Sequence, residues 1–152
     1  AQKWIVETDW LASHLDAPDL VVFDGSWHLP TTGRDPKAEY LAEHIPGALF
    51  FDIDDLSDEK SSLPHMLPST VKFASRMKKM GVGDGMRIVV YDTQGLFSAA
   101  RVWWTFRAMG HEDVAVLNTL ASHPERALEA GDTDEGKAEE VEKARKPKPV
   151  RR

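Results

Sequence analysis

The chain of 152 residues contains no cysteine. Without cysteine it can form no disulfide bond, no thiolate metal site and no thiol nucleophile. Its only sulfur atoms belong to five methionines, whose thioethers typically fill gaps in protein cores. Whatever chemistry the chain takes part in cannot use a reactive sulfur atom of its own.

Long apolar runs, excess positive charge and paired metal ligands are also missing. No apolar stretch approaches the roughly 18 residues of a membrane span, and the start of the chain has no signal-like segment, so we expect a cytoplasmic protein that contacts no membrane. The net charge of −6 argues against binding to nucleic acid. The histidines lack a metal-binding spacing, and the acidic stretch 52–59 lacks the pattern of a calcium loop, so we expect neither metal nor cofactor.

Strand-like and helix-like segments alternate through the first 117 residues, which predicts one α/β domain with a mostly parallel sheet over residues 1–120. Apolar runs predict strands at residues 4–6, 20–23, 48–51, 88–91 and 114–117, and the continuous run 20–23 suits a central strand. Thr8, Ser69 and Ser98 are expected to cap the starts of helices, and Pro36 is expected to be the first residue of another. The helix after Ser69 should present Val71, Phe73, Ala74, Met77 and Met80 to the core.

Residues 121–152 differ in character from the rest. They hold eight acidic and eight basic side chains, with the acids first and the bases last, so residues 1–120 carry the whole net charge. We expect this segment to be a charged tail that is partly helical or linker-like, with a basic binding arm as the alternative.

The segment from Tyr91 to Ala100 has the layout of a strand, a short loop and a helix start, which is typical of an anion-binding concavity lined by backbone N–H groups. Its first loop position, where a nucleophile would face those donors, is Asp92. A carboxylate cannot carry a persulfide, and its negative charge would take up the donors that an anionic substrate needs. We therefore interpret Asp92 as a structural cap of the loop and the following helix.

A series of short motifs follows in order from Trp4 to Leu117. They are DGSWHLP at 24–30, GRD at 33–35, EY at 39–40, HIPGA at 44–48, FFDID at 50–54, LPHMLP at 63–68, YD at 91–92, RVWW at 101–104 and FR at 106–107. Together they resemble the amino-terminal half of 3-mercaptopyruvate sulfurtransferases and tandem rhodaneses. The resemblance implies a rhodanese-like fold, whose sheet is flanked by helices on both faces.

In that family two rhodanese domains pack face to face around one active site, and the carboxy-terminal domain supplies the cysteine. The resemblance therefore implies a non-catalytic domain, with Asp92 at the position of the family's loop cysteine and the catalytic rhodanese domain as its partner. It also implies a small anionic sulfur donor, thiosulfate or 3-mercaptopyruvate, for the full enzyme. Asp35 and His44 are the candidates for a supporting His–carboxylate pair, although His44 could instead satisfy the last carbonyl groups of a helix.

Arg34, Arg101 and Arg107 could approach an anionic substrate, because a guanidinium group suits a carboxylate. Arg34, Arg101 and Trp27 are the residues that we expect to contact it. Ordinary ion pairs for the arginines, Arg107 included, and core packing for the tryptophans are the alternatives. We expect Trp103 or Trp104 to lie inside and Trp27 to lie near the interdomain face.

The chain departs from the family after its last expected strand, where residues 118–121 read NTLA in place of Asp-Gly-Gly. The leading functional hypothesis is a domain that completes an interdomain active site and is inactive alone. The alternative is a stand-alone binding module, or a homodimer, that uses the same face. A phosphatase-like hydrolase is disfavoured, because the chain offers neither a cysteine nor a set of metal-binding acids. Sequence alone does not decide between sulfur donors or among a truncation, a fragment and a natural single-domain protein.

Overall fold

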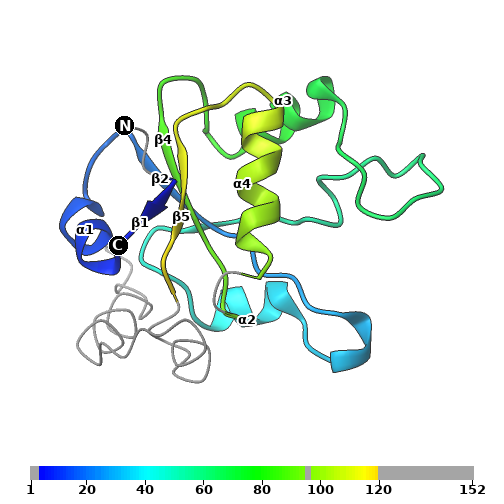
Figure 1. Ribbon diagram of the computed structural model, residues 1–152, viewed down its shortest axis with the longest axis horizontal. Helices are drawn as coiled ribbons and strands as arrows, with labels where there is room; N and C mark the ends of the chain where they lie inside the picture. Colours follow the sequence, from blue (N-terminus) through cyan, green and yellow to red (C-terminus); the bar gives the residue numbers. More distant parts are fainter. Residues whose placement is uncertain (1–3, 95–96, 120–152) are drawn as a thin grey trace.

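The computed structural model describes residues 4–94 and 97–119 (Figure 1). Within these residues, five parallel strands form one sheet in the order β1-β5-β4-β2-β3. The strands are β1 (Ile5–Val6), β2 (Leu20–Asp24), β3 (Leu49–Phe50), β4 (Arg87–Tyr91) and β5 (Val114–Leu117). The predicted α/β class and parallel sheet are confirmed. β2 is an interior strand as expected from its apolar run, although β4 occupies the middle of the sheet.

Helices connect the strands of the described part. They are α1 (Thr8–His14), the short 3-10 helix η1 (Pro30–Thr32), α2 (Pro36–Ala42), α3 (Thr70–Lys79) and α4 (Ala99–Ala108). Residues 52–68 contain neither helix nor strand and include prolines at 64 and 68, which favour an irregular loop. This long loop crosses from β3 to α3 and contributes side chains to the site described below.

Side chains alternate between the two faces of β4, and each face has its own helices. Ile88 and Val90 belong to the larger buried cluster, which α3 and α4 cover. Val89 and Tyr91 belong to a smaller cluster that also contains Leu11 of α1. Figure 1 shows α1 and α4 on opposite sides of the strands. The expected arrangement of helices on both faces is confirmed.

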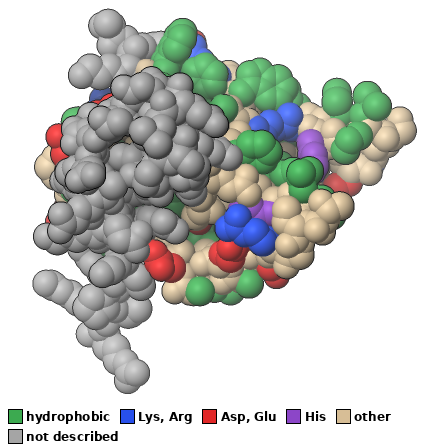
Figure 2. Space-filling model, turned by 60° about the horizontal axis from the view of Figure 1, so that its bottom comes forward, with side chains coloured by type: hydrophobic (Ala, Val, Ile, Leu, Met, Phe, Trp, Pro, Cys, Tyr) green, Lys and Arg blue, Asp and Glu red, His purple; other side chains and the backbone are tan. Residues whose placement is uncertain are grey.

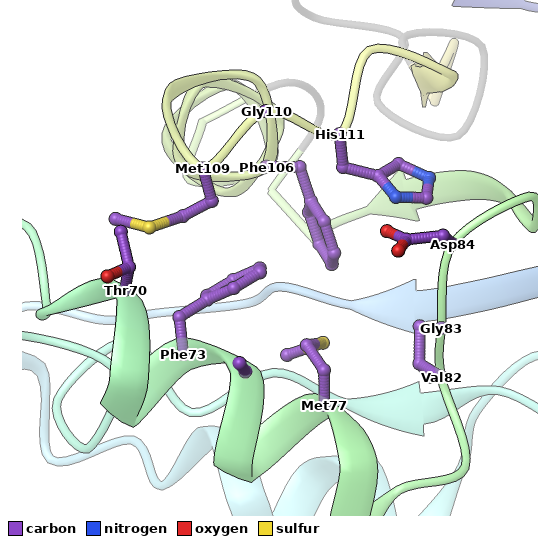
Figure 3. Close-up of a pocket in the computed structure, with 11 residues that line it drawn as sticks. Thr70, Phe73, Met77, Val82, Gly83, Asp84, Phe106, Met109, Gly110 and His111 are labelled. Carbon is purple, nitrogen blue, oxygen red and sulfur yellow. The ribbon is translucent and has the colours of Figure 1, made fainter.

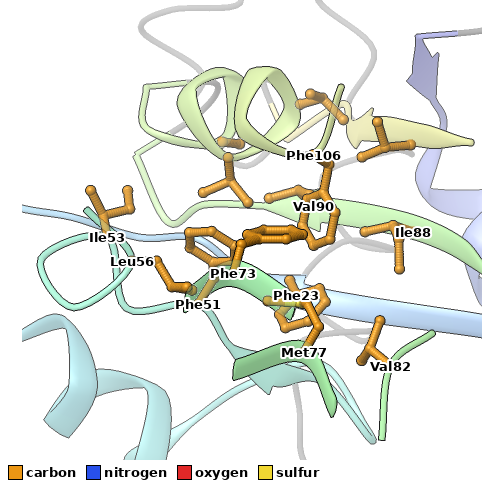
Figure 4. Packing of buried hydrophobic residues seen from close by; sticks show 14 residues of the cluster. Phe23, Phe51, Ile53, Leu56, Phe73, Met77, Val82, Ile88, Val90 and Phe106 are labelled. Carbon is orange, nitrogen blue, oxygen red and sulfur yellow. The ribbon is translucent and has the colours of Figure 1, made fainter. Parts of the chain in front are cut away.

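Four phenylalanine rings dominate the larger cluster. Phe106 of α4 lies 5.5 Å from Phe23, 5.7 Å from Phe51 and 5.3 Å from Phe73 between ring centroids, and all four side chains are buried. Figure 4 shows these rings gathered between the sheet and the two helices. Offset and edge-to-face contacts of this kind add to the stability that comes from burying apolar area.

Two predictions about helix faces and starts are wrong. Val71 points to solvent and is 78% exposed, because the buried face of α3 runs through Phe73 and Met77. Ala74 is also exposed, although it lines the hollow between α3 and α4. Thr8 is the first residue of α1 rather than its cap, and that helix start has no side-chain cap. Ser69 does cap α3, accepting a hydrogen bond from Lys72 N at 3.1 Å.

Of the two tryptophans expected to supply an inward-facing ring, Trp103 does so. Trp103 is half-buried against the larger cluster and donates its indole N–H to Val114 O at 3.1 Å, whereas Trp104 is 45% exposed. The predicted charged tail, residues 121–152, lies outside the described residues, so its expected structure is untested. No helix in the described part of the chain is long and apolar enough to cross a membrane.

A small hollow of about 310 Å³ lies between α3 and α4 (Figure 3). Phe73 and Met77 reach into it from α3, and Phe106 and Met109 reach into it from α4. His111, at its edge, contacts the carbonyl oxygen of Met86 through Nε2 at 2.7 Å. Because its walls belong to the larger cluster, we interpret this hollow as part of the core packing between the two helices.

Candidate functional site

The candidate site lies where β2 and β4 end side by side. These neighbouring parallel strands pair in register up to Asp24 and Tyr91. Their following loops remain joined, because Gly25 N donates to Tyr91 O at 2.8 Å. A Cβ atom on Gly25 would lie 2.7 Å from a methyl carbon of Val102, so this close approach requires glycine. The sequence thereby brings the loop after β2 against the start of α4, at the edge where open parallel sheets commonly bind ligands.

Asp92 is the first residue after β4 and is 2% exposed. Its Oδ1 accepts a hydrogen bond from Gln94 N at 2.9 Å, and its Oδ2 accepts one from Ala99 N, the first residue of α4, at 2.8 Å. Both carboxylate oxygens therefore bind backbone donors that an anion at this loop would use. The interpretation of Asp92 as a structural cap agrees with this geometry.

The prediction that the side chain of Ser98 caps α4 is wrong. The Ser98 hydroxyl group donates to Gly25 O at 2.6 Å and accepts a hydrogen bond from Trp27 N at 3.0 Å. Because Asp92 already accepts a hydrogen bond from Ala99 N, the Ser98 hydroxyl group is available to link the two loops by hydrogen bonds. Thr93 N also donates to Ser26 Oγ, in the other loop, at 3.1 Å. The two loops thus form one hydrogen-bonded unit.

Asp24 is a second buried carboxylic acid at this edge, 1% exposed, with Oδ1 accepting from Ser26 N at 2.9 Å. Burial raises its pKa above the usual 3.8, and the charge of Asp92 adds to that rise. Since the folded pKa lies above the unfolded one, the protonated form favours folding. The stability that Asp24 contributes is present at low pH and is lost as the pH rises through its folded pKa.

His28 joins the loop after β2 to α2 and to the Asp92 loop. Its side chain is fully buried, and the Gln94 side-chain amide donates to its Nδ1 at 2.7 Å. Its Nε2 lies 2.7 Å from Glu39 Oε2, although the alignment is not that of a hydrogen bond. Glu39 also pairs with Arg34, whose Nη2 lies 2.7 Å from Oε1. Sequence reasoning considered His28 only as a metal ligand, and the sole available signal was its place inside the DGSWHLP motif.

The suggested Asp35–His44 pair does not form. Asp35 caps the amino end of α2, where its Oδ1 accepts from Lys37 N at 3.0 Å and from Ala38 N at 3.1 Å. His44 follows the other end of that helix and donates from Nδ1 to Tyr40 O at 2.7 Å, with its ring stacked on the Tyr40 ring. A whole helix separates the two side chains, and the alternative interpretation of His44 as a partner of helix carbonyl groups is correct.

Trp27 and Arg101 both meet His65, in the long loop after β3. The Trp27 and His65 ring centroids lie 5.1 Å apart, and Asp54 Oδ1 contacts both the Trp27 indole N–H and His65 Nε2. Arg101 donates to the carbonyl oxygen of His65 and lies 5.0 Å from the ring centroid of Trp104. We call the surface formed by Trp27, His65, Met66, Arg101 and Trp104 the Arg101 surface. Sequence reasoning missed the part that His65 plays in it.

Arg101 differs from Arg34 because no carboxylate of the described residues lies within ion-pair distance of it. Burial lowers the pKa of its guanidinium group, a sign that water reaches it poorly. Arg34, by contrast, is neutralised by Glu39, and Arg107 lies over the rings of Trp4 and Trp103. Of the three candidates, Arg101 has the charge best placed to meet an external anion.

Hydrophobic side chains surround the candidate site at its outer rim. Exposed fractions reach 52% for Leu29, 59% for Leu63, 45% for Met66 and 49% for Phe97. Figure 2 brings the lower side of Figure 1 forward and shows hydrophobic, basic and histidine side chains interspersed on the part that grey atoms leave visible. In residues 4–94 and 97–119, no group of three histidine or acidic side chains could hold a metal ion.

A comparison with protein families matches residues 7–119 to the rhodanese-like domain. The chain is 52% identical over 114 residues to thiosulfate/3-mercaptopyruvate sulfurtransferase 1, mitochondrial, of Arabidopsis thaliana, an alignment that covers 75% of this chain and 30% of that protein. It is 46% identical over 125 residues to 3-mercaptopyruvate sulfurtransferase of Homo sapiens, covering 78% of this chain and 42% of that protein.

Solved structures of sulfurtransferases also match this chain. The crystal structure of SseA from Escherichia coli, described as a 3-mercaptopyruvate sulfotransferase, matches with a TM-score of 0.72 and 47% identity, covering 76% of this chain and 45% of that one. The sulfur transferase subunit of yeast mitochondrial complex I matches with a TM-score of 0.74 and 39% identity, covering 82% of this chain and 41% of that one. The chain thus spans less than half the length of these relatives. From its fold and from these matches, the chain belongs to the rhodanese family and is similar to one domain of the 3-mercaptopyruvate sulfurtransferases.

Proposed function

We propose that this chain acts as the amino-terminal, non-catalytic rhodanese domain of a thiosulfate/3-mercaptopyruvate sulfurtransferase. It completes an interdomain active site whose catalytic cysteine belongs to a second rhodanese domain. The observation that carries the proposal is the buried carboxylate of Asp92, which accepts hydrogen bonds from Gln94 N and Ala99 N in a chain without cysteine. An anion-binding loop whose donors serve its own carboxylate supports a structural role rather than a catalytic one.

The Arg101 surface is the part of the chain that we propose to face the second domain. The guanidinium group of Arg101 forms no ion pair with a carboxylate of the described residues, so an anionic sulfur donor held between the domains could pair with it. Trp27 supplies the wall beside it. Arg34 contributes less, because Glu39 already pairs with it. A cytoplasmic location stays a prediction, since one similar protein is named as mitochondrial.

The purified chain should transfer no sulfur. With thiosulfate or 3-mercaptopyruvate as donor, and cyanide or dithiothreitol as acceptor, we expect product formation no faster than in protein-free buffer, because no thiol can accept the sulfur atom. An intact two-domain sulfurtransferase at the same molar concentration is the positive control. Turnover that rises in proportion to the concentration of the chain would contradict the proposal.

The same surface supports a second candidate function, the recruitment of a protein partner or a second copy of the chain. Exposed Trp104 beside a poorly solvated guanidinium group is typical of the residues that dominate protein interfaces. Both candidate functions use the Arg101 surface, and they differ only in the partner that covers it.

Trp104→Glu should therefore weaken association. We expect the isolated chain to dimerise weakly at high concentration and the variant to raise the dissociation constant at least tenfold, because a tryptophan at an interface centre commonly contributes about 2 kcal/mol or more. Sedimentation equilibrium measures this constant. Val71→Glu, which adds the same charge at an exposed position on α3, is the matched control. An equal effect of the two substitutions would rule out a specific role of this surface.

A further inference from the structure

A groove of about 940 Å³ lies at the amino end of the sheet, opposite the candidate site. It follows the edge strand β1 and the first residues of β4 and β5, and α1 forms one of its walls. Trp4, 54% exposed, and the half-buried Trp10 supply its two large aromatic rings. Neither the candidate site nor the proposed function uses this groove.

The groove combines aromatic rings with negative charge. Four acidic residues line it, Glu7, Asp9, Glu112 and Asp113. Two guanidinium groups lie over its indole rings, that of Arg87 over Trp10 and that of Arg107 over Trp4, and Arg87 also lies 3.4 Å from Asp113. Acidic side chains next to indole rings suit a ligand that carries both cations and flat apolar groups. Aromatic grooves also accept proline, whose fixed φ leaves little conformational entropy to lose on binding.

One stretch of this chain combines basic side chains with prolines. Residues 143–152 read KARKPKPVRR, with six basic side chains, two prolines and no acid. The preceding part of residues 121–152 is acidic, so the basic character is confined to this stretch. It lies outside the described residues.

The chain between β5 and residues 143–152 is long enough to reach the groove. Residue 119 follows β5, the neighbour of β1, and 23 residues separate it from residue 143. Extended chain of that length reaches about 75 Å, more than the roughly 30 Å diameter of a small domain. Tethering also gives the stretch an effective concentration on the order of 1 mM at the groove, so even weak binding fills it. We propose that residues 143–152 bind in this groove, through charge pairs with its acids and stacking of proline on its indole rings.

A fluorescein-labelled peptide of sequence KARKPKPVRR tests the proposal by fluorescence anisotropy. The receptor is the full chain with the six basic residues of 143–152 replaced by glutamine, which leaves the groove open. At low salt we expect this variant to bind the peptide with a dissociation constant on the order of 100 μM. The unmodified chain should bind it at least tenfold more weakly, because its own basic stretch competes. Equal binding to the two proteins would overturn the proposal.

Charge reversal in the groove provides a second test of the proposal. In the glutamine-substituted chain, Asp9→Lys with Glu112→Lys should weaken peptide binding at least tenfold. Glu43→Lys with Asp58→Lys makes the same charge change at exposed residues outside the groove and should alter binding less than twofold. A peptide with alanine in place of both prolines should bind several-fold more weakly. Equal losses in the two charge-reversed proteins would overturn the assignment to the groove, and dimers held by the basic stretch would overturn docking within one chain.

Discussion

Asp92→Cys should place a reactive thiolate in the loop after β4. The substitution removes the carboxylate that now accepts hydrogen bonds from Gln94 N and Ala99 N, so both donors are left facing the new sulfur atom at the start of α4. Helix amino termini lower thiol pKa values from about 8.5 to between roughly 3.5 and 7.5. The variant should therefore react with iodoacetamide at pH 6.5 at least about ten times faster than an ordinary cysteine.

Ser75→Cys is the matched control, because Ser75 is exposed in the interior of α3, away from a helix start. Circular dichroism establishes that both variants fold, and mass spectrometry after incubation with thiosulfate shows whether either thiolate has taken the outer sulfur atom of thiosulfate, with release of sulfite, and retains it as a persulfide. We expect that adduct only for Asp92→Cys. If both thiols react at the same rate in folded proteins, the backbone donors around position 92 do not form an anion-binding loop.

The same substitution changes the electrostatics of its neighbour. Asp24 now has a raised pKa because of burial and because of the negative charge of Asp92. A neutral thiol at position 92 would remove the second contribution, whereas a thiolate would restore it. The titration of Asp24, followed by NMR, should therefore respond to alkylation of the variant, which keeps the thiol uncharged.

The secondary structure and fold class could be predicted from the sequence because they depend on local patterns. The run from Ile88 to Tyr91 is apolar throughout, and it becomes the middle strand, buried on both faces. Ser69 could be recognised as a cap from its place before an amphipathic segment. Val71 was misassigned, because a period of 3.6 residues leaves the buried face of a ten-residue helix uncertain by one position on each side.

The site was only partly predictable, because its contacts join residues far apart in the chain. The capping role of Asp92 follows from its position between strand and helix, and its two hydrogen bonds are local. The links from His28 to Gln94 and from Arg101 to His65 span 66 and 36 residues, and no spacing rule indicates them. The resemblance identified the right motifs, but the Asp35–His44 pair fails because each side chain finds a nearer backbone partner.

Phe106→Ala should be the most destabilising single substitution that we predict. Phe106 is 1% exposed and lies within 6 Å, between ring centroids, of Phe23, Phe51 and Phe73. Its truncation loses buried apolar area and opens a cavity that surrounding rings fill only in part, at a cost of about 3–5 kcal/mol in the free energy of unfolding. For a domain of this size that corresponds to a fall in Tm of roughly 10–20 °C.

Val71→Ala provides the control, because Val71 on α3 is 78% exposed and its truncation should change the free energy of unfolding by less than about 0.5 kcal/mol. Urea unfolding followed by circular dichroism measures both variants. Phe106 also packs where α3 and α4 meet the sheet, so its loss should loosen the start of α4 and, with it, the cap provided by Asp92. Hydrogen exchange at Ala99 N should accelerate in Phe106→Ala and remain unchanged in Val71→Ala. A slow Ala99 amide in both variants would show that the loop is held by its own hydrogen bonds, independently of the core beneath it.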